Sequence, residues 1–184
     1  MEHKTIHNSS VKILDSYKEF SYQEELTTKL DNTTGNFNQG IINEIVLWKV
    51  NRYAKITDKA IDLINSIGSD IIMNEELTIK ILKLLLNTKG IQLPMASTIL
   101  RFKNKYVYQI IDQRVYRIIC KTNPQKLNSN NSEKNINSNI DLYLNYLKDL
   151  RIVCNLLSIP FEESDRILYM ADKDINKDFP LKNY

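Results

Sequence analysis

The sequence predicts an all-α fold. Apolar residues recur at helical spacing through most of the chain, no segment shows convincing strand alternation, and good helix-capping residues stand at several predicted boundaries. The runs IVLW and YVYQII are rich in strand-forming residues, but each stands in a helical context. A chain of 184 residues can bury a real hydrophobic core. We expect a single all-α domain over 14–184, after a flexible tail at 1–13.

The first two predicted helices are separated by a break. The helix expected over 14–30 has its larger apolar residues roughly on one side. Residues 31–40 are rich in turn-forming types. The helix expected over 41–53 (IINEIVLWKVNRY) is strongly apolar and contains Trp48. This region therefore predicts two amphipathic or apolar helices joined by a turn.

Two helices with clear start signals come next. Thr57 is a good N-cap for a helix over 57–67, and Gly68 ends it. Asn74 begins a helix over 74–87 that has acids in its first turn and lysines later. That order of charges suits the helix dipole, which favours anions at the N-terminus and cations at the C-terminus.

The rest of the chain continues the helical pattern with one interruption. Pro94 stands near the start of the next helix, where its missing N–H costs nothing. Tyr143, Tyr146 and Leu150 form an apolar helical stripe and predict core positions. The predicted elements are helices over 94–102 and 112–121, a polar loop over 123–139 that is low in complexity, and helices over 140–158 and 161–174.

Composition excludes several classes of protein. No apolar run is long enough to span a membrane, and the N-terminal residues lack the apolar region of a signal peptide. Cys120 and Cys154 predict buried free thiols. The two histidines, His3 and His7, argue against a histidine metal site or a Ser-His triad. No phosphate-binding or dinucleotide-binding glycine pattern is present, so we expect no cofactor.

The segment from Asn87 to Lys121 carries the strongest functional signal. Seven of its residues are Lys or Arg and Asp112 is its single acid, although the whole chain has a net charge of only +3. A positive patch built around one carboxylate suits the binding of a polyanion next to a reactive group. This segment therefore predicts a polyanionic partner.

A helix, a tight turn and a second helix are predicted inside this segment. The turn spans 89–92, and Gly90 suits it because glycine tolerates positive φ. Ala96 and Ser97 are small enough to let the two helices pack closely. Such a hairpin exposes backbone N–H groups at the start of its second helix, and these can hold a DNA phosphate without reading sequence.

The spacing between the hairpin glycine and the acid is informative. Asp112 follows Gly90 by 22 positions and lies within IIDQRVYR at 110–117. In these features residues 87–121 resemble the helix-hairpin-helix DNA glycosylases of base-excision repair. That family has a catalytic Asp at this distance from its first hairpin glycine, followed by His or Arg, an apolar residue and a further Arg. The helix-rich remainder of the chain is compatible with the family.

The resemblance implies an enzyme that hydrolyses the N-glycosidic bond of a damaged or modified base in duplex DNA. Asp112 would stabilise positive charge on the deoxyribose as the bond breaks, or orient the attacking water. The base would be flipped into a pocket and stacked on aromatic side chains.

The sequence departs from the family at two hairpin positions. Gln92 replaces the second glycine of the family pattern, and Pro94 stands where bifunctional members carry a Schiff-base lysine. The resemblance therefore implies monofunctional base removal without strand cleavage. The iron-sulfur cysteines of some members are absent, so no cluster is expected.

The predicted site combines three groups of residues. We expect a cytoplasmic, nucleoid-associated monomer. Its partner would be duplex DNA, and a protein partner is compatible with the sequence. The catalytic residue would be Asp112; DNA would be bound by Lys89, Gly90, Gln92, Arg101, Lys103, Lys105, Arg114 and Arg117; the base pocket would draw on Trp48, Lys49, Arg52, Tyr53, Tyr106 and Tyr108.

Simpler interpretations remain open. Asp112 could only cap a helix, with Arg114 or Arg117 as a solvated partner. Trp48 could be a core residue. Two other functions fit the chain: a DNA-binding module of the same fold without catalysis, as a subunit of a repair or defence system, and an all-α protein-interaction module whose basic patch meets an acidic partner. Salt-sensitive DNA affinity would distinguish these two.

Overall fold

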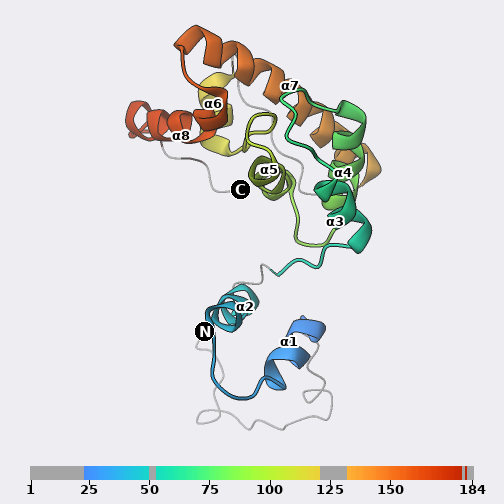
Figure 1. Cartoon of the computed structure of the whole chain (residues 1–184). Coiled ribbons are helices and arrows are strands. Elements are labelled where there is room, and N and C mark those ends of the chain that lie inside the picture. Colours follow the sequence, from blue (N-terminus) through green and yellow to red (C-terminus); the bar gives the residue numbers. More distant parts are fainter. Residues whose placement is uncertain (1–22, 50–52, 121–131, 180, 182–184) are drawn as a thin grey trace, which may run out of the picture. The chain divides into compact units, whose positions relative to one another are not determined.

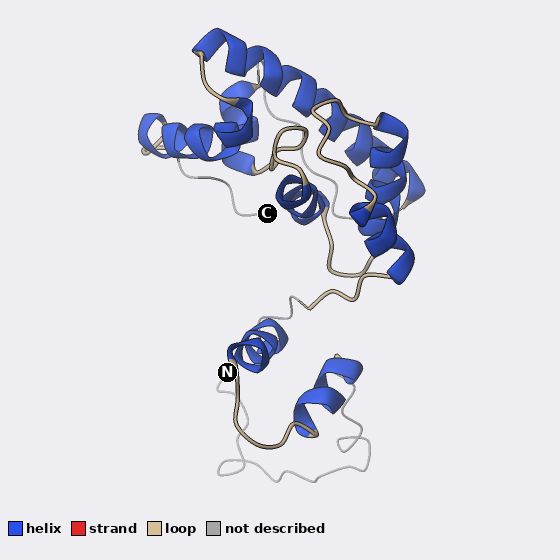
Figure 2. Ribbon diagram, viewed as in Figure 1, coloured by secondary structure: helices blue, strands red, loops and turns tan. Residues whose placement is uncertain are grey.

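Helices alone form the architecture. A computed structural model describes residues 23–49, 53–120, 132–179 and 181. Every regular element within these residues is a helix (Figure 2), so the predicted all-α class is confirmed. None of the described helices combines the length and apolar composition that a bilayer crossing requires.

The chain divides into two compact units instead of the single domain expected over 14–184. The first unit is Met1–Tyr53 and the second is Ala54–Tyr184. The tail expected at 1–13 lies outside the described residues. The hairpin and Asp112 belong to the second unit, which therefore contains the candidate catalytic residue.

Two helices make up the described part of the first unit. They are α1 (Glu24–Asp31) and α2 (Gln39–Lys49), shown in blue tones in Figure 1. Helix α2 starts inside the stretch 31–40 that was predicted as a break. The reason is a cap: Asn38 Oδ1 accepts a hydrogen bond from the Ile41 N–H at 3.0 Å. The beginning of the helix expected over 14–30 falls on residues outside the described part.

Polar contacts join α1 and α2. The indole Nε1 of Trp48 donates to Thr27 Oγ1 at 2.9 Å, and Lys29 forms an ion pair with Glu44. Trp48 is half-buried, and α2 has no fully buried residue. Large apolar side chains of this unit are instead exposed: Phe37, Ile42, Val46, Leu47 and Tyr53.

The second unit contains the remaining helices. Within it α7 runs along one side, with α3 and α4 near one of its ends and α6 and α8 near the other, while α5 lies between these pairs (Figure 1). The elements are α3 (Asp58–Asn65), α4 (Glu75–Asn87), α5 (Leu93–Lys103), α6 (Gln113–Ile119), α7 (Glu133–Leu157), the short 3-10 helix η2 (Phe161–Glu163) and α8 (Ser164–Ile175).

The predicted helix starts are confirmed by their caps. Thr57 Oγ1 accepts from the Ala60 N–H at 3.3 Å at the start of α3. Asn74 Oδ1 accepts from the Leu77 N–H at 2.9 Å at the start of α4. Pro94 occupies the second position of α5. Thr57 and Asn74 each accept a hydrogen bond from a backbone N–H that the helix itself leaves unpaired, and Pro94 has no such N–H.

The loop predicted over 123–139 is wrong at its C-terminal end. Helix α7 already begins at Glu133, whereas 121–131 lie outside the described residues. Ile136 and Ile140 are buried and extend the apolar stripe of α7 by one turn at each step. Lys134 and Asn137, which suggested a loop, are exposed on α7, whereas Asn139 is buried next to Ile140. Tertiary packing thus stabilises a helix here in spite of the polar composition.

The core lies between α4, α5 and α7. The predicted core positions Tyr143, Tyr146 and Leu150 are all buried, which confirms the apolar stripe. Both cysteines are free as predicted, but only Cys154 is buried and Cys120 is partly exposed. The core also includes Ile81, Leu82, Leu85, Leu86, Ile91, Leu93, Ala96, Leu100, Val107, Ile111, Val115 and Leu147.

Candidate DNA-binding and catalytic site

Two helices joined by a short turn stand where the sequence predicted a helix, a turn and a second helix. Helix α4 ends at Asn87, α5 begins at Leu93, and Gly90 between them has φ of +87°. This left-handed conformation is favourable for glycine and strained for residues with a Cβ. The Ile91 N–H closes the turn by donating to the Thr88 carbonyl at 3.1 Å. The conformation at position 90 thus favours glycine, as the sequence predicted.

The hairpin tip is exposed while its flanks are anchored. Lys89, Gly90 and Gln92 are exposed, but Ile91 and Leu93 are buried in the core. The side chain of Gln92, the N-cap residue of α5, makes no capping hydrogen bond. The tip therefore presents backbone to solvent from a fixed position, although Gln92 replaces the glycine of the family pattern.

Ser97 links α5 to the segment that carries the acid. Ala96 and Ser97 are both fully buried, and Ser97 Oγ accepts a hydrogen bond from the Ile111 N–H at 3.2 Å. The same hydroxyl donates to the Pro94 carbonyl at 2.8 Å. The small residue predicted to allow close packing thus also fixes the backbone next to Asp112.

Two tyrosines of α7 hold the same backbone from the other side. The hydroxyl of Tyr143 donates to the Gln109 carbonyl at 3.0 Å, and that of Tyr146 donates to the Ile110 carbonyl at 2.6 Å. These bonds lie in or next to the core, where competing water is scarce. Side chains from α5 and α7 therefore set the backbone path that leads into Asp112.

Asp112 begins α6, as predicted, and caps it. Its Oδ1 accepts from the Val115 N–H at 2.8 Å. The residue is half-buried, and desolvation raises the pKa of its carboxyl, against the lowering effect of backbone hydrogen bonds from Val115 and Arg114 and of the Arg114 charge. The capping role is observed, and it leaves the carboxylate held in a fixed orientation in a partly dehydrated place.

Arg114 and Arg117, predicted to bind DNA, are paired inside the protein. Arg114 Nη1 lies 3.0 Å from Asp172 Oδ2, and Arg117 Nε lies 2.6 Å from Asp172 Oδ1. Arg117 also donates to the carbonyl of Phe179 at 2.8 Å. Burial would raise the pKa of Asp172, but hydrogen bonds from Arg117, Asn176 and Arg114 outweigh it and hold that pKa below its usual value.

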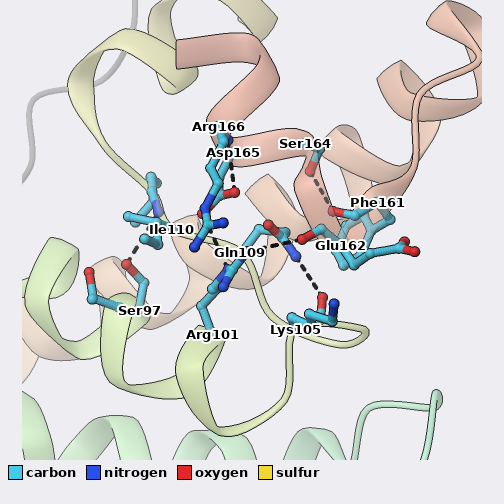
Figure 3. A network of polar contacts seen from close by, with 12 residues as sticks. Ser97, Arg101, Lys105, Gln109, Ile110, Phe161, Glu162, Ser164, Asp165 and Arg166 are labelled. Carbon is cyan, nitrogen blue, oxygen red and sulfur yellow. Dashed lines mark hydrogen bonds and ion pairs between the residues drawn. The ribbon is translucent and has the colours of Figure 1, made fainter. Parts of the chain in front are cut away.

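Arg101 is likewise turned inward. The residue is buried; its Nη2 donates to the Glu162 carbonyl at 3.1 Å, and its Nε lies 3.5 Å from Asp165 Oδ2 (Figure 3). A buried guanidinium in this network does not reach a phosphate at the surface. The prediction that Arg101 contacts DNA therefore does not agree with its position, because the helical pattern alone did not reveal its acidic partner on α8.

Three of the residues predicted to bind DNA are exposed lysines of the second unit. Lys89 lies at the hairpin, and Lys103 and Lys105 lie at the end of α5 and just after it; all three are exposed. The Lys105 ammonium lies 5.2 Å from the centre of the Tyr106 ring, which is also exposed. These side chains are available to a partner, whereas the three arginines are paired with acids of α8.

Tyr108 does not offer a surface platform for a base. It is buried, and its hydroxyl is 2.7 Å from Thr78 Oγ1. It lines a cavity of about 100 Å³ together with Asn74 and Asn104. That volume is well below the several hundred Å³ typical of ligand pockets.

The other predicted pocket residues belong to the first unit. Trp48 and Lys49 lie on α2, and Tyr53 is exposed at the end of that unit. Arg52 lies outside the described residues. Of the six predicted pocket residues the structure thus describes five, three in the first unit and two in the second.

Loss of the Tyr146 hydroxyl is expected to destabilise the protein at the backbone segment that leads into Asp112. Tyr146→Phe should lower the free energy of unfolding by about 1–2 kcal/mol, because the Ile110 carbonyl loses its partner in a dry environment. Urea denaturation of the variant and of Tyr106→Phe, at an exposed position just after α5, would measure the effect. Equal stability of the two variants would show that this hydrogen bond contributes nothing.

Metal chemistry finds no support in the side chains described. Across residues 23–49, 53–120 and 132–179, no three His, Cys, Asp or Glu side chains lie together in a way that could hold a metal ion.

Compared with known proteins, the chain matches no family model, no curated protein and no solved structure. The likeness to the glycosylases therefore rests on the residues of the hairpin and of the Asp112 segment.

Proposed function

We propose that this protein binds duplex DNA through the hairpin between α4 and α5 and removes a damaged or modified base by hydrolysing its N-glycosidic bond, assisted by Asp112. One observation carries the proposal. A carboxylate is held at the start of α6, 22 positions after a hairpin glycine in the left-handed conformation.

The hairpin supports phosphate binding. Helix geometry leaves the first N–H groups of α5 without intrahelical acceptors, and Gln92 does not cap them. The positive end of the helix dipole favours an anion at the same place. Lys89 is exposed beside this end of the helix and adds a full positive charge. Contacts of this kind fix the position of DNA without reading its sequence.

The surroundings of Asp112 support a role in bond cleavage. A fixed negative charge stabilises the positive charge that develops on the sugar more strongly where water is scarce. Asp112 is half-buried and restrained by the Val115 N–H, so it needs little rearrangement. The hydrogen bonds of Ser97, Tyr143 and Tyr146 restrain the backbone before it. Pro94 has no amine, which supports base removal without strand cleavage from that position.

The test is base release from a panel of lesion duplexes. Wild type and Asp112→Asn are incubated with duplexes that carry uracil, 8-oxoguanine, alkylated purines or mismatches, and abasic sites are scored by alkali-dependent cleavage. Asn is also a good N-cap, so the variant should keep its fold and lose base release by at least about 100-fold. Asp141→Asn, an exposed acid on α7, is the matched control. Equal rates for wild type and Asp112→Asn would remove Asp112 from the mechanism.

A DNA-binding module without catalysis is the second candidate. The hydrogen bond from Val115 to Asp112 explains this Asp as a helix cap without any reaction. Affinity for undamaged duplex that falls steeply with salt, together with no base release from any lesion, would favour this candidate. Absence of salt-sensitive binding would instead favour an interaction with an acidic protein.

A further inference from the structure

Helix α8 packs against α6 through an acidic face. The buried residues of α8 are Ser164, Asp165, Leu168 and Asp172, whereas Met170 and Ile175 on the same helix are exposed. The two helices lie side by side in the second unit (Figure 1). A helix normally buries its apolar side chains and exposes its charges. Leu168 follows this rule, but Asp165 and Asp172 do not, so these two buried acids need partners inside the protein.

Asp172 forms ion pairs with two arginines of α6. Its carboxylate is completely buried and lies 3.0 Å from Arg114 Nη1 and 2.6 Å from Arg117 Nε. Asn176 Nδ2 donates to the same carboxylate at 2.8 Å. Arg117 alone already supplies two donors, through Nε and Nη2. The bond to Arg114 is thus additional to a complete bidentate pair.

Arg114 is held by α8 on two sides. Besides its bond to Asp172, its guanidinium lies 5.6 Å from the centre of the Tyr169 ring. Tyr169 and Asp172 are three positions apart and so lie on neighbouring turns of α8. The Arg114 side chain therefore reaches from α6 towards α8, although its backbone is only two positions from Asp112.

We propose that Asp172 is a positioning residue that, with Tyr169, draws the Arg114 guanidinium towards α8 and keeps it from pairing with Asp112. The value of this arrangement for base removal rests on the proposed function. An Arg–Asp112 ion pair would neutralise the charge that is meant to stabilise the developing cation. The geometry that carries the inference is the shared carboxylate of Asp172 at the centre of two arginines.

The charge environment of Asp112 makes the effect measurable. The groups that act on it electrostatically are Arg114 from α6, Asp165 from α8 and Tyr146 from α7. An opposite charge within a few ångströms lowers the pKa of an Asp by about one to three units. Release of Arg114 from α8 should therefore lower the pKa of Asp112.

The experiment is a pH titration of the Asp112 side-chain carboxyl carbon by NMR, with the signal identified from its absence in Asp112→Asn. The variants are Asp172→Asn, Arg114→Gln and their combination; Asp174→Asn, an exposed acid on α8, is the control. We expect Asp172→Asn to lower the pKa of Asp112 by about one unit, and the added Arg114→Gln to reverse that shift. The control should leave it unchanged.

Two results would overturn the inference. One is an Asp112 pKa in Asp172→Asn that equals the wild-type value. The other is a rise of about one unit in Arg114→Gln alone, because it would show that Arg114 already pairs with Asp112. Arg114→Gln leaves Arg117 on Asp172, so this variant can overturn the inference even where Asp172→Asn does not fold. The titration needs no substrate, so an inactive wild type would end the proposed function without deciding the position of Arg114.

Discussion

Asp172→Ala is expected to lower the free energy of unfolding by about 3–5 kcal/mol, because it leaves two arginines beside an empty, water-poor space. Arg114 and Arg117 both lie within 3.0 Å of this carboxylate, which is completely buried. Urea denaturation followed by far-ultraviolet circular dichroism measures the change. The control Asp174→Ala removes an exposed acid of the same helix and should change stability by less than about 0.5 kcal/mol.

The pH dependence of this loss has a definite sign. The pKa of Asp172 is lower in the folded protein than in the unfolded chain, where an Asp titrates near 3.9. Its contribution is therefore fully present above that unfolded value and is lost as the pH falls through the folded value. The difference between wild type and Asp172→Ala should shrink under acid conditions. A difference that stays constant from neutral pH to about pH 2 would contradict the role of the charge.

Removing one partner of the Arg101–Asp165 pair should be comparably costly. Asp165→Ala leaves the Arg101 guanidinium buried without its counter-ion, and we expect a loss of about 3–5 kcal/mol. Arg101 keeps one hydrogen bond, to the Glu162 carbonyl (Figure 3). Urea denaturation is again the measurement.

Replacing both partners should cost far less. The Nε of Arg101 and Oδ2 of Asp165 are 3.5 Å apart, and neither atom makes a hydrogen bond. Such a loosely made buried pair recovers little of its desolvation cost. The combination of Arg101→Met with Asp165→Leu should therefore recover most of the stability that Asp165→Ala loses. A double variant no more stable than Asp165→Ala would show that the pair is a net stabilising interaction.

Local signals in the sequence predicted most helix starts. Thr57, Asn74 and Asp112 act through hydrogen bonds to N–H groups three positions ahead, so nearby residues contain the whole interaction. The start of α7 was missed because Asn-rich composition outweighed the spacing of Ile136 and Ile140. There, packing against the rest of the second unit decides the structure.

The contacts around the candidate site depend on distant parts of the chain. Arg117 and Asp172 are 55 positions apart, and Arg101 and Glu162 are 61 positions apart. No local pattern in the sequence indicates which acid pairs with which arginine. The Lys and Arg residues of 87–121 therefore looked unpaired and exposed, as in a DNA-binding surface. The buried acids at 165 and 172, seven positions apart on one predicted helix, were the available hint.

The position of the single tryptophan lets the first unit be observed by itself. The single tryptophan, Trp48, lies on α2 of the first unit. The buried Tyr143 and Tyr146 lie in the second unit, with their hydroxyls bonded to the backbone that leads into Asp112. Tryptophan emission therefore reports on the first unit and does not report on the two tyrosines that support the candidate catalytic residue. A melting curve recorded through tryptophan alone would miss the loss of that support.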